Sequence, residues 1–245
     1  MAITGPVHQA TGTAVAGTSI SVTITAPTSG NSLVATIVNN SGRNVSSISG
    51  GGCTWDTSAR IKTNSSTTVT EIWVGANSSG SGTTVTINFN LAVASSAANV
   101  SEWAGATNTP AGTVSTDKTN SNTGTTGTPN TGAITNTKTT DLVIYVCGAL
   151  GVGLTFTETA SFGTALSTGN NAIFAAGYQI ETSSKGPFTG TTSTSGTVTQ
   201  WAGCILSVFV GLATVTTTKT ITGQSYLAAA AAGVKPQMML MGVGS

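Results

Sequence analysis

The chain has 245 residues, of which Thr, Ser and Gly supply 108, and 15 residues are charged. The net charge of +1 excludes a protein that binds nucleic acid by neutralising phosphates, because such binding needs a concentrated basic surface. Hydrophobic residues make up 38% of the chain, enough to bury a core, and the abundance of Thr, Val and Ile favours strands over helices.

Residues 1–17 are predicted to form an N-terminal arm ahead of the first strand. This segment holds His8, the one histidine of the chain, and it lacks the basic and apolar regions of a secretory signal. The longest apolar stretch, at about 202–215, is shorter than the roughly 20 residues that span a bilayer. We therefore expect a soluble protein that is not exported and has no membrane partner.

Alternation of apolar and hydroxyl side chains predicts eight strands. At Ile20, Val22 and Ile24 the branched side chains fall on one face, and the Ser and Thr between them fall on the other. Turns rich in Gly, Ser and Asn separate the strands, without helical periodicity. The predicted strands cover residues 18–25, 32–38, 67–75, 83–90, 97–104, 141–148, 171–181 and 197–210. The expected fold class is an all-β antiparallel β-sandwich, jelly-roll-like, with extended N- and C-terminal arms.

Two short segments of the first half recur in the second half. Residues 101–106 (Ser-Glu-Trp-Ala-Gly-Ala) resemble residues 199–204 (Thr-Gln-Trp-Ala-Gly-Cys), and residues 33–38 resemble residues 142–147. Loop insertions explain the unequal spacing of the two pairs. The echo therefore predicts two related antiparallel halves.

The two halves are expected at about 18–106 and 128–213. We favour a single jelly roll over residues 18–213, with two consecutive small sandwiches as the alternative. Trp103 and Trp201 correspond in the echo, so we expect both rings to be buried at equivalent places.

No spaced motif indicates a catalytic, cofactor or metal site. His8 lies in the predicted arm, away from the rigid setting that a catalytic triad or a zinc site needs. Cys53, Cys147 and Cys204 are too few and too scattered for structural zinc, and we expect buried free thiols. The sequence therefore predicts a protein that is not an enzyme and holds no cofactor and no metal.

Acidic residues leave two weaker alternatives open. Glu71, Glu102 and Glu181 lie in predicted strands, and a glycosidase would need two such carboxylates about 5–10 Å apart at a cleft. Otherwise they keep strand edges soluble. Residues 117–124 carry oxygen ligands without the spacing of a calcium loop, so an Asn- and Asp-rich turn is the preferred interpretation. Residues 119–137 are predicted to form a long loop.

Trp55 is the tryptophan most expected near the surface, because it follows the glycine-rich turn at residues 50–52. An exposed aromatic ring at such a position is a possible ligand-binding residue, and a glycan is the ligand considered. Core packing is the preferred interpretation for the other tryptophans.

Residues 214–245 are predicted to form a C-terminal arm that contacts a partner. Three of the four methionines lie in it, and burying each large apolar side chain is worth roughly 1.5–3 kcal/mol. Flexible thioethers suit an adaptable contact with another chain. The alternative is an arm that folds back over an edge of its own sandwich. The residues expected to bind the partner are Leu227, Val234, Met238, Met239, Leu240 and Met241.

In general texture the chain resembles jelly-roll domains of bacteriophage virion proteins of the head-decoration or fibre type. The resemblance covers roughly residues 15–213 and rests on the low charge, the Gly-rich turns, the Gly-Gly-Gly-Cys-Thr-Trp segment at 50–55, the Glu-Ile-Trp-Val segment at 71–74 and the Trp-Ala-Gly echo. It implies a structural protein that self-associates or joins another shell protein. The implied location is a virion assembled in the host cytoplasm. A carbohydrate-binding or adhesive module on an extracellular surface is the alternative.

Overall fold

A computed structural model describes residues 2–106, 114–138, 140–158, 162, 164–168, 173–182 and 186–209. The compact body covers Met1–Ala213, and the second unit, Thr214–Ser245, lies outside the described residues. Within the described ranges the regular structure is all strand, and no helix there is long and apolar enough to cross a membrane.

The described strands form two antiparallel sheets. The first sheet contains β1 (Gln9–Thr23), β2 (Ser32–Asn39), β3 (Val45–Gly50), β4 (Thr54–Trp55), β5 (Ile61–Ser65), β6 (Thr68–Ala76) and β7 (Thr84–Trp103). The second sheet contains β8 (Ser115–Gly124), β10 (Asp141–Glu158), β11 (Thr164–Thr168), β12 (Ile173–Glu181) and β13 (Phe188–Phe209), with β9 (Asn130–Ile134) paired to β13.

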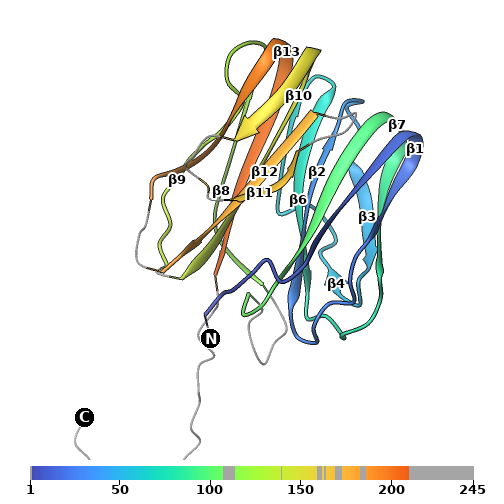
Figure 1. Cartoon of the computed structure of the whole chain (residues 1–245), viewed down its shortest axis with the longest axis vertical. Helices are drawn as coiled ribbons and strands as arrows, with labels where there is room; N and C mark the ends of the chain where they lie inside the picture. Colours follow the sequence, from blue (N-terminus) through green and yellow to red (C-terminus); the bar gives the residue numbers. More distant parts are fainter. Residues whose placement is uncertain are drawn as a thin grey trace, which may run out of the picture. The chain divides into compact units, whose positions relative to one another are not determined.

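The two sheets pack face to face around a shared apolar core (Figure 1). Val34, Val38 and Ile72 of the first sheet meet Leu142 and Ile144 of the second, and all five side chains are buried. Side chains alternate between the faces of a strand, so this core uses one face of each sheet. The expected all-β antiparallel β-sandwich is confirmed.

Each half of the chain completes its own sheet, so the connectivity is simpler than the interleaved path of a jelly roll. The strand order β1-β7-β2-β6 in the first sheet is repeated as β8-β13-β10-β12 in the second. The chain therefore contains two halves with the same strand order. They are packed on each other in one body and do not stand as consecutive separate sandwiches.

Long bent strands account for two differences from the sequence-based expectations. The strands predicted at 83–90 and 97–104 are one strand, β7, whose residues 89–92 between them have no partner on β1. Residues 9–17, expected in an arm, form the first half of β1 and pair with β7. A register shift between Gly17 and Ser19, beside the positive φ of Ala16, lets β1 follow the bend while the pairing continues.

The polar segment expected as a loop at 119–137 contains β8 and β9 in place of a continuous excursion. β8 pairs with the apolar strand β13, which supplies the hydrogen bonds that a solvated loop would take from water. The Asn120 side chain donates to the Ala133 carbonyl, and Asn122 donates to Asn130. The second half consequently begins near residue 115 instead of 128.

The outer face of each sheet is also covered. In the first sheet, β1, β3 and the start of β7 curl over it, and Ile20, Ile48 and Ile87 pack on Trp73. In the second sheet, β9 and the start of β13 place Ile134 and Phe188 over Val143 and Tyr145 of β10. The sandwich thus has a shared central core and separate apolar clusters on both outer faces.

Trp103 and Trp201 are both buried, at 0% and 4% exposure, but at different places. Trp103 ends β7 and packs in the core between the sheets. Trp201 lies in the middle of β13, opposite Ala149, in a separate cluster with Val198 and Ala149. The expectation of equivalent positions is wrong, because the echoed residues fall at different distances from the ends of their strands.

Candidate functional site

Trp55 is half-buried on β4, and its own chain uses part of its ring. The indole N–H donates to the Gly50 carbonyl over 2.9 Å. The ring lies against Gly75, where a Cβ atom would approach it within 2.9 Å. The Gly50–Gly52 turn needs positive φ at all three residues, which glycine adopts without strain. The ligand-binding role of Trp55 stays a prediction.

The residues predicted to bind a partner lie outside the described residues. They are Leu227, Val234, Met238, Met239, Leu240 and Met241.

Glu102 is a buried carboxylate that holds three segments together. Its oxygens accept hydrogen bonds from the Asn31 amide over 2.6 Å and from the Thr28 N–H over 2.8 Å. His8 Nδ1 lies 2.8 Å from Oε2, in the segment just before β1. Burial would raise the pKa of Glu102, but these hydrogen bonds hold it below its usual value. The adjoining cavity is about 10 Å³, room for about one water molecule.

Glu71 has a comparable structural role on β6, with 2% exposure. One oxygen accepts from the Val45 N–H and the other from the Trp73 indole, both over 2.8 Å. Burial raises the pKa of Glu71, and the two hydrogen bonds oppose that rise. Both oxygens are committed to tying β3 to β6, so this geometry suits a packing role.

The third predicted carboxylate, Glu181, belongs to an acidic cluster at one end of the second sheet. Glu181 lies directly opposite Asp141 in the β10–β12 pairing and accepts a hydrogen bond from Gln179. Asp117 on β8 accepts from the backbone and the hydroxyl of Thr137. We define Asp117, Asp141 and Glu181 as the acidic cluster.

Asp141 is the unusual member of the acidic cluster. Its side chain is fully buried, and no described residue donates a hydrogen bond to either carboxylate oxygen. Burial raises its pKa to about 7, and the negative charges of Asp117 and Glu181 add to the rise, while Lys138 opposes it. Sequence reasoning missed Asp141, because it reads only as the polar start of an apolar strand.

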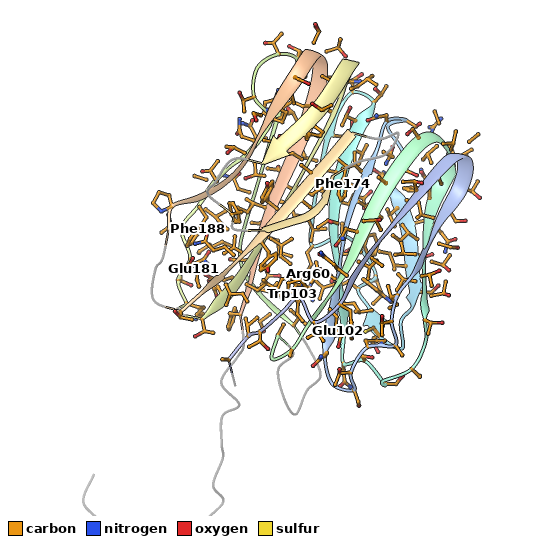
Figure 2. The ribbon with its side chains drawn as sticks, viewed as in Figure 1. Arg60, Glu102, Trp103, Phe174, Glu181 and Phe188 are labelled. Carbon is orange, nitrogen blue, oxygen red and sulfur yellow. The ribbon has the colours of Figure 1, made fainter. Side chains whose placement is uncertain are left out.

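The second half of the chain also contains a groove of about 400 Å³. Gln179, which donates to Glu181, also lines the groove. Phe162 and Phe188 also line it, although both side chains are more than 90% buried. Figure 2 labels Glu181 of β12 and Phe188 of β13, two strands of the second half. The groove residues are Phe162, Gln179, Pro187, Phe188, Thr189 and Thr191.

Arg60 joins the two halves. Its guanidinium forms a bidentate ion pair with Asp56, at 2.6 and 2.9 Å. It also donates to the Val114 carbonyl and the Thr116 hydroxyl, each over 2.9 Å, at the start of β8. This fixed fork suits a structural clamp.

Within the described ranges, no group of three or more His, Cys, Asp or Glu side chains has a metal-binding arrangement. All three cysteines are free thiols. Comparisons with protein-family models, curated proteins and solved structures find no match.

Proposed function

We propose that this chain is a non-enzymatic structural protein that self-associates, or joins another shell protein, in a viral particle or similar assembly. The observation that carries the proposal is that the described body covers its own apolar faces. Apolar clusters cover both outer faces as well as the interface between the sheets. In the described ranges, four large apolar side chains are exposed: Val7, Val15, Leu91 and Leu150.

The apolar sequence of the C-terminal arm therefore has little complementary apolar surface on the described body. Burying Met238, Met239 and Leu240 against another chain would stabilise the assembly, because burial of each large apolar side chain contributes roughly 1.5–3 kcal/mol. Glu71 and Glu102 support a structural role too, since their oxygens are committed to hydrogen bonds within the fold. Because residues 9–17 belong to β1, the proposal rests on the C-terminal arm.

Deletion of residues 223–245 tests this function. We expect light scattering to show assemblies for the full chain and monomers for the shortened chain, with the same melting temperature for the monomeric body. A full chain that stays monomeric at all concentrations contradicts the proposal. So does a shortened chain that still assembles but melts at a lower temperature, since the arm would then cover its own sandwich.

A glycan-binding function is the second candidate, favoured by the groove. Gln179, Thr189 and Thr191 offer amide and hydroxyl groups that match the hydroxyls of a neutral sugar. Binding of the purified protein to a glycan array, lost in Gln179→Ala and kept in Trp55→Ala, would support the groove. Loss in Trp55→Ala alone would place the ligand at the glycine-rich turn instead.

A further inference from the structure

Strand β1 forms a free edge of the first sheet over its whole length. Among the described strands it pairs with β7 alone, and the sheet order begins with β1 (Figure 1). A sheet edge presents unpaired backbone N–H and C=O groups to any chain that can add a strand.

The hydrogen-bond pattern shows which peptide groups of β1 face outward. Glu102 donates its N–H to the His8 carbonyl, and in an antiparallel pair such hydrogen-bonded positions alternate along the strand. Even-numbered residues from His8 to Ala14 therefore bond to β7. The N–H and C=O groups of Thr11, Thr13 and Val15 point away from the sheet. These three side chains are exposed.

β1 lacks the features that usually prevent pairing at an edge. Natural edge strands carry Lys, Pro or inward-pointing charges. β1 contains neither a charged residue nor a proline, and no charged residue occurs from Gln9 to Gly42. Val15 is 63% exposed on the outer face. The register shift at Gly17 interrupts the middle of the strand and leaves Gln9–Val15 regular.

The sequence after the last described strand contains a segment suited to this edge. Residues 214–222 read Thr-Val-Thr-Thr-Thr-Lys-Thr-Ile-Thr, without Gly or Pro. This composition is among the strongest for strands. Nine extended residues span about 30 Å, and the seven residues Gln9–Val15 span about 23 Å. Lys219 is the single charge of the segment, so no like charge on β1 opposes its approach.

We propose that Gln9–Val15 of β1 receives residues 214–222 of a second copy of this chain as an added strand. The inference rests on the proposed function and names the surface that its C-terminal arm recognises. Backbone hydrogen bonds to Thr11, Thr13 and Val15 fix the position and register of the added strand, and the apolar residues beyond 222 supply the side-chain burial without which the strand does not stay bound.

Thr13→Pro tests the receiving edge. It removes an outward N–H and leaves the β1–β7 ladder intact, because proline is tolerated at such edge positions. We expect loss of assembly by light scattering with a melting temperature close to that of the unmodified body. Thr13→Val keeps the N–H and should assemble normally. Thr13→Lys should block assembly. Ser49→Lys is the control, because it adds the same charge at an exposed position of β3, and it should assemble normally.

Disulfide trapping between two chains tests the occupant. One chain carries Thr13→Cys, and a longer tagged chain carries Thr218→Cys. Both chains also carry Cys53→Ser, because Cys53 is half-buried, and the remaining native thiols, Cys147 and Cys204, are buried and give little background. We expect a disulfide-linked heterodimer when the two chains are mixed, and a synthetic peptide of residues 214–245 should reduce its yield.

The outcomes separate this inference from the proposed function. If the unmodified chain does not assemble, the proposed function fails. If it assembles and Thr13→Pro assembles equally well, the β1 inference is overturned while the proposed function stands. A third outcome is assembly that survives deletion of residues 214–245 but is lost in Thr13→Pro. It would show that β1 pairs with β1 of a second copy, and it would overturn residues 214–222 as the added strand. A chain carrying both cysteines that forms only an intramolecular disulfide would overturn the exchange between copies.

Discussion

Asp141 shows how a single residue can make stability depend on pH. The fold buries its carboxyl beside Asp117 and Glu181, and none of the residues that the structure describes donates a hydrogen bond to either oxygen. In the unfolded chain the same group titrates near pH 3.8, and in the fold its pKa rises to about 7. Between these values the folded state keeps a proton that the unfolded state has released. The free energy of unfolding therefore falls as pH rises from about 4 to 7.

Asp141→Asn should remove most of this pH dependence. We expect the variant to be more stable than the unmodified protein at pH 8, by about 2–4 kcal/mol, and to differ less at pH 4. Thermal melts at both pH values measure it. Asp56→Asn is the matched control and should destabilise at pH 8, because it breaks the ion pair with Arg60. An Asp141→Asn variant that is less stable at pH 8 contradicts the assignment.

The three thiols should differ in reactivity. Burial raises the pKa of Cys204 to about 12 and that of Cys53 to about 11, and it raises the pKa of Cys147 further still. Cys53 is half-buried, and the other two are fully buried. We expect a thiol reagent to label Cys53 first in the native protein and all three after denaturation. Mass spectrometry of the labelled chain measures this, and rapid native labelling of Cys147 or Cys204 would contradict their burial.

At the residue scale, the sequence predicts which side chains are buried better than it predicts their hydrogen-bond partners. The apolar neighbours of Cys147 and Cys204 suffice to place both inside. The partners of Glu102 are different, because His8, Thr28 and Asn31 lie far from it in the chain and only the folded sheet brings them together. The acidic cluster likewise joins three strands, so no local pattern indicates it.

At the scale of elements, alternation finds the strands that face a core and misses those that do not. Ile20, Val22 and Ile24 mark β1 correctly. β8 has no apolar face, and its pairing with β13 makes it a strand. The bend of β7 also lies beyond local patterns, since it follows from the curl of the whole sheet over its outer apolar cluster.

Trp201 should be a main stabilising contact of β13. Its ring packs on Ala149 and covers Gly124, where a Cβ atom would lie 2.6 Å from the indole, and its N–H donates to the Thr126 carbonyl. Trp201→Ala should lower the free energy of unfolding by about 3–5 kcal/mol through cavity formation. Trp201→Phe, which keeps most of the ring volume, should lower it less. Denaturant unfolding measures both, and a change below about 1 kcal/mol for the alanine variant would contradict this packing.

At the scale of the whole molecule, the repeated strand order explains the closed body. The two halves share one strand order, which is β1-β7-β2-β6 in the first and β8-β13-β10-β12 in the second. Each half buries one face of its sheet against the other half and covers the opposite face with its own residues. The sequence echo indicates this repetition, although Trp103 and Trp201 do not correspond in space. In a body closed in this way, the assembly that we propose would use the sheet edges and the C-terminal arm.

Electron microscopy of the purified full chain tests the central claim of assembly most directly. We expect regular particles or filaments built from repeated sandwich-sized subunits, and their loss in the chain that lacks residues 223–245. Images that show only separate 24.1 kDa monomers, at concentrations up to the solubility limit, would contradict the account.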